Sequence, residues 1–88
     1  MLVIFRSRGD DWIRFRTTLL ENAQGIKDMG CTGIEAYRNR KHPDEWVMLQ
    51  YWPDKPTFDE FAREKGPALD RLAGVRWTDV STWLESAL

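Results

Sequence analysis

The chain has 88 residues, with 13 basic and 14 acidic side chains, one histidine and a single cysteine. This length suits one domain over residues 1–88, and the balanced charge provides no basic surface for nucleic acid or anionic lipid. One cysteine cannot form an internal disulfide, and one histidine offers no cluster of metal ligands, so we expect no metal and a reduced, cytoplasmic setting.

The first third of the sequence predicts a strand followed by an amphipathic helix. The apolar run Leu2–Ser7 reads as a buried strand, and it is too short for a membrane span or a signal peptide, so no membrane partner is expected. Asp10 or Asp11 is a suitable N-cap. Apolar residues then recur at helical spacing up to Met29-Gly30: Trp12, Phe15, Leu19, Ala23 and Ile26.

A hairpin is predicted next, from residues 31–39 through a polar reversal to residues 45–52. In the second strand, Val47, Leu49 and Tyr51 alternate with a set of larger side chains, namely Trp46, Met48, Gln50 and Trp52. Both faces of this strand are expected to be covered. If Arg40 and Glu45 close the loop, the predicted partners are Tyr37 with Met48 and Glu35 with Gln50.

The last third predicts a helix, a shorter helical piece and a final strand. Thr57 and Glu60 have the spacing of a capping box, and Gly66-Pro67 is expected to interrupt the helix that they open. A short helical piece then ends at Gly74. The strand predicted over residues 75–84 places Trp77, Asp79, Ser81 and Trp83 on one face.

This order of elements indicates a ferredoxin-like α+β fold. Strand, helix, strand, strand, helix, strand is the split arrangement in which both helices cover one face of a four-stranded antiparallel sheet. The other face is then free. We expect the free face to carry the aromatic residues of the last two strands, and to be covered by a second copy of the chain: Trp46, Met48, Trp52, Trp77 and Trp83.

Two interpretations of the aromatic face stay open: a dimer interface, or a pocket for a small aromatic molecule. The polar groups expected with it are Gln50, Asp79, Ser81 and Tyr37. A buried Asp79 would have a raised pKa, which suits a base that deprotonates a phenol or quinol. The alternative interpretation, which is favoured, makes Asp79 a hydrogen-bonded interface residue or part of a bulge at the edge of the strand.

Other candidates for chemistry have simpler explanations. His42 lies in the polar reversal, where a solvated turn residue is expected, and Cys31 reads as a small buried residue. An aromatic free face also occurs in RNA-recognition domains, but residues 46–52 lack the glycines of that motif.

Several segments resemble the antibiotic biosynthesis monooxygenase-like family of dimeric α+β barrels. They are Gly30-Cys31-Thr32-Gly33-Ile34-Glu35-Ala36-Tyr37, Met48-Leu49-Gln50-Tyr51-Trp52, Thr57-Phe58-Asp59-Glu60-Phe61 and Gly66-Pro67-Ala68-Leu69. The resemblance implies two sheets packed face to face, and a site that oxidises phenols or quinols with dioxygen and without a cofactor. It implies pocket roles for Tyr37 and Trp52. Met48 stands where several members have Asn, and no His occupies the second helix, which argues against the haem degradation of other relatives.

The function expected from the sequence is therefore a cofactor-independent monooxygenase that acts on an aromatic phenol or quinol between the sheets of a homodimer. The alternative is a non-catalytic dimeric module that binds a small molecule or has a structural role. Asp79 and Tyr37 are the expected catalytic residues. The expected substrate-binding residues are Trp52, Met48, Gln50, Trp77 and Trp83.

Overall fold

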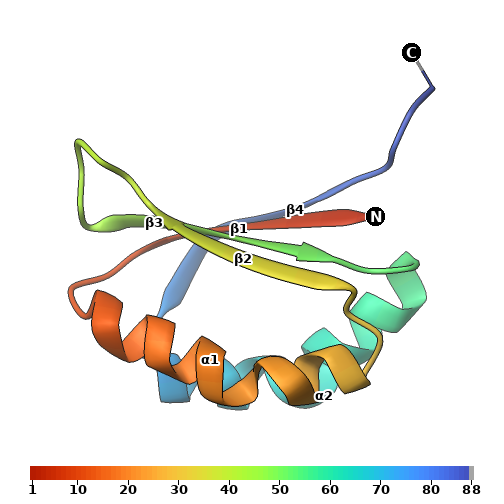
Figure 1. The fold of residues 1–88 in the computed structure, drawn as a ribbon, viewed down its shortest axis with the longest axis horizontal. Helices are drawn as coiled ribbons and strands as arrows, with labels where there is room; N and C mark the ends of the chain where they lie inside the picture. Colours follow the sequence, from red (N-terminus) through yellow and green to blue (C-terminus); the bar gives the residue numbers. More distant parts are fainter. Residues whose placement is uncertain (88) are drawn as a thin grey trace.

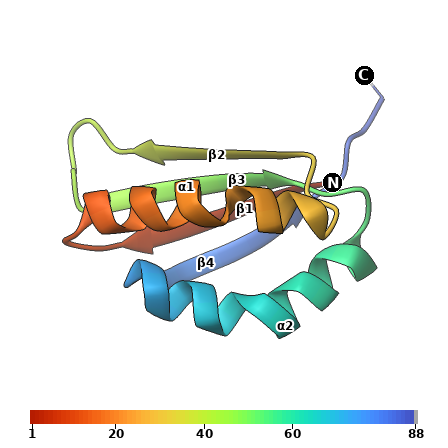
Figure 2. The ribbon, with the colours of Figure 1, turned by 60° about the horizontal axis from the view of Figure 1, so that its bottom comes forward.

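Residues 1–87, which the computed structural model describes, form a four-stranded antiparallel sheet covered by two helices. The elements are β1 (Leu2–Arg8), α1 (Trp12–Asp28), β2 (Gly33–Arg38), β3 (Glu45–Tyr51), α2 (Lys55–Ala73) and β4 (Arg76–Trp83). The strand order is β2-β3-β1-β4, and both helices lie on the same face of the sheet (Figures 1 and 2). The predicted ferredoxin-like α+β fold is confirmed.

The first helix begins and ends as its sequence predicts. The side chain of Asp11 accepts a hydrogen bond from the backbone N–H of Arg14 at 3.0 Å, which satisfies one of the free donors of the first turn. Gly30 follows the helix with a φ of 120°, a conformation that favours glycine. The chain can therefore reverse sharply from α1 into β2.

The second helix differs from the prediction at its start and in its middle. Asp54, not Thr57, is the N-cap, and its carboxylate accepts from the Thr57 N–H at 2.9 Å. The helix also continues through Pro67 to Ala73, with Gly74 as its C-cap, although an interior proline removes a backbone hydrogen bond. Its buried face spans the proline, with Phe58 and Phe61 on one side and Ala73 on the other. Packing of this face outweighs the local preference for a break.

The hairpin register differs by one residue from the prediction. Tyr37 pairs with Val47, and Glu35 pairs with Leu49. Because side chains alternate across a strand, a shift of one residue exchanges the two faces. A separate difference is that the large side chains of β3 point toward the helices rather than toward the free face: Trp46, Met48 and Gln50, each at most 4% exposed.

A bulge in β4 separates two side chains that the sequence placed together. Arg6 pairs with Asp79, but the next residue, Ser7, pairs with Trp77, so Thr78 is an additional residue. Trp77 shares the helix side with Ser7, while Asp79 shares the free face with Arg6. The prediction that Trp77 and Asp79 occupy one face was therefore wrong.

The core between the sheet and the helices is rich in aromatic rings. Trp46 stacks on Phe15 with ring centroids 5.2 Å apart, and Trp12 contacts both rings. Trp52, which follows β3, lies against Phe61 with centroids 4.9 Å apart. Of the tryptophans expected on the free face, Trp46, Trp52 and Trp77 belong instead to this core.

The free face carries a smaller set of apolar and aromatic side chains, alternating with the core residues of the same strands. By register these are Ile4, Val47, Leu49, Tyr51, Tyr37 and Trp83. Trp83 is 56% exposed and Tyr37 is 50% exposed. Neither helix within residues 1–87 combines the length and the hydropathy of a membrane span.

Candidate functional site

A cavity of about 310 Å³ lies between the two helices and the helix-side face of the sheet. This volume is within the range of small-molecule sites. Its walls are mainly aromatic and aliphatic, and the residues that define them include Phe5, Phe15, Leu19, Ile26, Met48, Phe58, Phe61, Ala62, Leu69, Val75, Trp77 and Val80. The helical periodicity of α1 and α2 and the alternation of β3 direct these side chains inward. The cavity can accept a planar apolar molecule.

Few polar side chains reach the cavity wall from α1. The Asn22 amide nitrogen donates to the Thr18 carbonyl at 2.8 Å, and the Thr18 hydroxyl donates to the Arg14 carbonyl at 2.8 Å. Both donors are thus directed along the helix itself. The amide oxygen of Asn22 is left as a possible acceptor for a ligand.

Gln50 supplies a buried amide from the centre of the sheet. It is 1% exposed, and its Oε1 accepts from the indole Nε1 of Trp52 at 2.9 Å. Its Nε2 reaches the sulfur of Met48 at 3.6 Å, and sulfur is a weak acceptor. Since an amide nitrogen has two N–H groups, Gln50 retains donor capacity toward a ligand oxygen.

Asp70 is the one charged side chain on the cavity wall among residues 1–87. It is half-buried, and its Oδ1 accepts from the indole Nε1 of Trp77 at 2.7 Å. Burial raises the pKa of the Asp70 carboxyl, and the hydrogen bond from Trp77 opposes that rise. The carboxylate is therefore easier to protonate than an exposed aspartate.

Asp70 was not among the site residues predicted from the sequence. Helical spacing was the available signal: Asp70 lies three residues before Ala73, four after Gly66 and eight after Ala62, all of which line the cavity. The expected interruption at Gly66-Pro67 removed this relationship, because it treated the two halves of α2 as separate pieces.

Three of the predicted substrate-binding residues line the cavity, namely Met48, Gln50 and Trp77. They do so from the helix side of the sheet and not from the free face. Trp52 is 1% exposed and does not line the cavity, but its indole donates a hydrogen bond to Gln50, which does. The roles of these residues in binding stay predictions.

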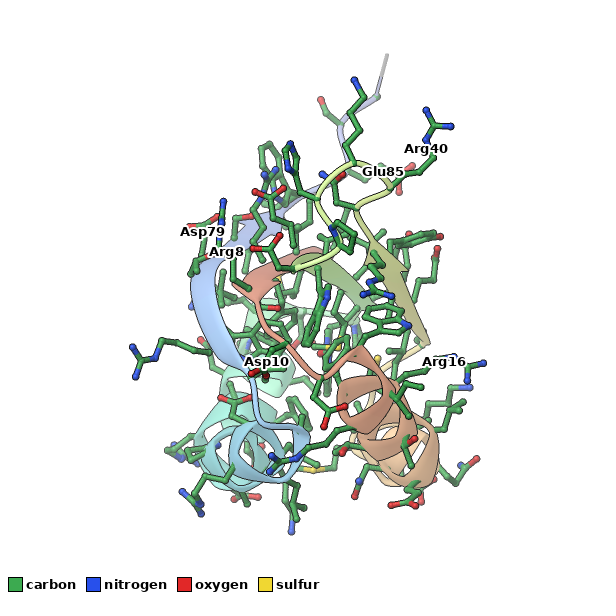
Figure 3. The ribbon with its side chains drawn as sticks, turned by 90° about the vertical axis from the view of Figure 1, so that its left-hand side faces the viewer. Arg8, Asp10, Arg16, Arg40, Asp79 and Glu85 are labelled. Carbon is green, nitrogen blue, oxygen red and sulfur yellow. The ribbon has the colours of Figure 1, made fainter. Side chains whose placement is uncertain are left out.

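The other predicted site residues lie across the sheet from the cavity. Asp79 is exposed on the outer side of β4 (Figure 3), and the indole of Trp83 donates to the Ser81 hydroxyl at 2.9 Å. Tyr37 donates its hydroxyl to the Glu35 carboxylate, and this hydrogen bond raises the pKa of Tyr37. The sheet thus separates the two expected catalytic residues, Asp79 and Tyr37, from the cavity.

A second hollow, of about 430 Å³, lies near the hairpin end of the sheet and includes Tyr37. Its character is polar. Arg8, which lines it, forms ion pairs with Asp44 at 3.2 Å and with Glu45, another lining residue, at 2.8 Å. A site with internal ion pairs suits an apolar aromatic molecule less well than the cavity on the helix side.

Cysteine and metal chemistry find little support in the described part of the chain. Burial raises the pKa of the Cys31 thiol, which favours the protonated and unreactive form. Within residues 1–87, no three histidine, cysteine or acidic side chains are grouped as metal ligands. His42 lies exposed in the hairpin loop.

Comparison with known proteins relates this arrangement to a family. A model of the antibiotic biosynthesis monooxygenase family matches residues 5–66, which include most of β1, all of α1, β2 and β3, and the first part of α2. No curated protein sequence matches the chain.

Solved structures share the fold at low sequence identity. SnoaB, described as a cofactor-independent oxygenase from Streptomyces nogalater, is 14% identical with a TM-score of 0.75, over 97% of this chain and 93% of SnoaB. Rv0793 from Mycobacterium tuberculosis is 18% identical with a TM-score of 0.70, over 99% and 97% of the two chains. A conserved protein from Methanosarcina mazei Go1 is 14% identical with a TM-score of 0.71, over 91% and 88%.

Proposed function

The chain belongs to the antibiotic biosynthesis monooxygenase family, and we propose on this basis that it is a cofactor-independent monooxygenase acting on an aromatic phenol or quinol. The observation that carries the proposal is the apolar cavity of about 310 Å³ between the helices and the sheet. The similar fold of SnoaB, a cofactor-independent oxygenase, supports the same reaction class.

In this chemistry the substrate itself supplies the electrons. A phenol with an adjacent activated ring CH₂ loses a proton, and the resulting anion reduces dioxygen. The CH₂ becomes a carbonyl that keeps one oxygen atom, and the other oxygen atom leaves as water, so no external reductant is needed. The protein must bind the ring, accept a proton and exclude bulk water.

The cavity is a better place for this reaction than a space between two sheets. Met48, Gln50 and Trp77, which were expected to bind the substrate, contribute to its wall. Apolar walls also strengthen the few polar interactions inside them, because the local dielectric is low. The hollow on the free face instead contains the charged side chains of Arg8 and Glu45.

Self-association through the free face is the second part of the proposal. Tyr51 is 37% exposed and Trp83 is 56% exposed, and half-buried Val47 and Leu49 lie on the same face. Soluble monomers rarely leave a contiguous apolar surface of this kind uncovered. A homodimer with the sheets facing each other would bury it.

The direct test is oxygen uptake with a panel of polycyclic phenols and hydroquinones, followed by mass spectrometry of products formed under ¹⁸O₂. We expect one ¹⁸O atom in the product and uptake faster than in buffer. Ala62→Phe, which fills the cavity from α2, should abolish the reaction. Ala68→Phe is the matched control, because Ala68 is exposed on the same helix.

Far-UV circular dichroism would confirm that both variants fold. Uptake no faster than the buffer blank for every phenol, in a protein that still binds them, would favour the non-catalytic binding module. Equal activity in the Ala62→Phe variant would place the reaction outside the cavity.

A further inference from the structure

The cavity contains a single titratable group, and that group has no cationic partner. Among the described residues that form its wall, Asp70 is the only one with a charge, and no lysine, arginine or histidine joins it. We propose that Asp70 is the proton acceptor of the cavity and that it restricts the cavity to neutral aromatic molecules carrying a hydrogen-bond donor. The catalytic part of this inference rests on the proposed function, whereas the binding part does not.

The geometry fixes the direction of the carboxylate. The Trp77 indole donates to Oδ1 at 2.7 Å, and its ring is held against Phe5 with centroids 5.0 Å apart. The bulge at Thr78 is the feature that turns Trp77 toward the helices. With one oxygen held in this way, Oδ2 is available to accept a proton from a molecule in the cavity.

The groups that face Asp70 from the surrounding elements leave its charge uncompensated. The other polar side chains of the cavity wall, Thr18 and Asn22 from α1 and Gln50 from β3, are all neutral. The cation of this region, Arg14, donates its Nε to the Leu72 carbonyl and its Nη2 to the Arg71 carbonyl, both at 2.9 Å. Arg14 thus interacts with the C-terminal end of α2 rather than with the carboxylate.

The uncompensated carboxylate in an apolar cavity determines which ligand charge is accepted. A negatively charged ligand would lie near an uncompensated carboxylate in an apolar site, which is unfavourable at close range. A neutral phenol instead donates its O–H to the charged Asp70 carboxylate, which is a favourable contact. We therefore expect neutral phenols to bind and aromatic carboxylates to be excluded.

The proton transfer follows from the same contact. The phenolic O–H bond breaks, a new O–H bond forms at Asp70, and the phenolate keeps the electron pair that dioxygen then accepts. Burial favours the protonated carboxyl, which makes Asp70 a stronger base than an exposed aspartate. The proton later passes to the oxygen atom that leaves as water.

The test is binding of three two-ring probes, measured by calorimetry at pH 7: 1-naphthol, naphthalene and 1-naphthoate. We expect wild-type protein to bind 1-naphthol about tenfold more tightly than naphthalene, the effect of one hydrogen bond to a charged acceptor, and to bind 1-naphthoate most weakly. Asp70→Asn should reduce the preference for 1-naphthol and strengthen 1-naphthoate binding about tenfold. Glu60→Gln, an exposed carboxylate on the same helix, should change neither ratio.

A measurement on the unmodified protein keeps the inference testable if Asp70→Asn fails to fold. Lowering the pH until Asp70 is protonated should strengthen the binding of 1-naphthoate relative to naphthalene while that ligand is still ionised. Absence of 1-naphthol binding, or probe ratios that do not respond to Asp70→Asn or to pH, would overturn the inference.

The two proposals fail separately. If the probes behave as expected but no phenol is oxidised, the ligand selectivity of Asp70 stands and the monooxygenase function falls. If neutral phenols are oxidised and Asp70→Asn retains the wild-type rate and pH profile, the function stands and Asp70 is not the base.

Discussion

The indole N–H of Trp52 donates a hydrogen bond to Oε1 of Gln50, two residues earlier in the chain, at 2.9 Å. Both residues are 1% exposed, so this contact determines which end of the Gln50 amide faces Met48 and the cavity. A tryptophan that does not itself form the cavity wall thereby orients a donor on that wall.

Replacement of this tryptophan should weaken both folding and binding. In Trp52→Phe most of the ring is kept, but Oε1 of Gln50 loses its donor while buried. We expect the free energy of unfolding to fall by ~1–3 kcal/mol, the usual cost of an unsatisfied buried polar group. Urea unfolding would measure it.

A double-mutant cycle separates the hydrogen bond from the packing of the ring. Gln50→Leu in the Trp52→Phe background removes the unsatisfied oxygen, so the double variant should be more stable than Trp52→Phe alone. If the two substitutions are simply additive, the hydrogen bond contributes no coupling.

Asp70 should make the stability of the protein depend on pH in a characteristic direction. Because its pKa is raised in the folded state, its protonated form stabilises the fold. This contribution is present below the unfolded pKa of about 3.9 and is lost as pH rises through the folded pKa. The melting temperature of Asp70→Asn minus that of wild type should therefore increase as pH rises from 4 to 7. A decrease over that interval would contradict the assignment.

The hydrogen bond from the Trp77 indole opposes the rise in the pKa of Asp70. Removal of the indole should therefore raise the pKa of Asp70 further. In Trp77→Phe the carboxyl loses the donor that stabilises its charged form. The pKa of Asp70, followed by the carboxyl ¹³C chemical shift, should be higher in the variant than in wild type. An equal or lower value would mean that the hydrogen bond does not form.

Two glycines should respond in opposite ways to the same substitution. A Cβ at Gly9 would lie 2.4 Å from the buried ring of Trp46, so Gly9→Ala should destabilise the protein by ~1–3 kcal/mol. A Cβ at Gly25 would meet nothing within 4 Å, and Gly25→Ala inside α1 should stabilise it by ~0.5–1 kcal/mol. Denaturant midpoints of both variants would show the contrast.

Substitutions on the two faces of the sheet should separate effects on folding from effects on dimer assembly. Trp46→Ala removes a buried ring and should cost ~3–5 kcal/mol of folding free energy. Trp83→Lys changes the free face, so it should weaken the dimer and leave the melting temperature of the monomer nearly unchanged. Ile13→Lys, at a helix position that is 73% exposed, is the control. Sedimentation showing wild-type monomers at micromolar concentration would contradict the proposed dimer.

The sequence predicted the order of the elements and the ferredoxin-like fold, because apolar spacing and the caps of α1 agree with the final structure. It did not predict which face of β3 is buried. Both faces of this strand carry large apolar side chains, so periodicity gave no preference, and Trp46 was predicted on the wrong side. The one-residue error in the hairpin register separately placed Tyr37 and Glu35 on the same face as Met48 and Gln50.

Two further local features explain why the predicted site differs from the observed one. A bulge at Thr78 separates Trp77 from Asp79, whereas simple alternation along residues 75–84 predicts that the two share a face. Pro67 suggested a break in α2, although tertiary packing keeps the helix continuous and brings Asp70 to the cavity. Met48 and Gln50 were nevertheless selected, because an amide and a thioether among aromatic residues indicated a small-molecule site.

The most direct test of the central claim is the position of a bound aromatic ring. Protein with labelled methyl groups and unlabelled 1-naphthol would be examined by filtered nuclear Overhauser spectroscopy. Binding between the helices and the sheet predicts contacts from the ring protons to the methyl groups of Ala62 and Leu69. Contacts to the methyl groups of Val47 and Leu49, on the free face, would contradict it.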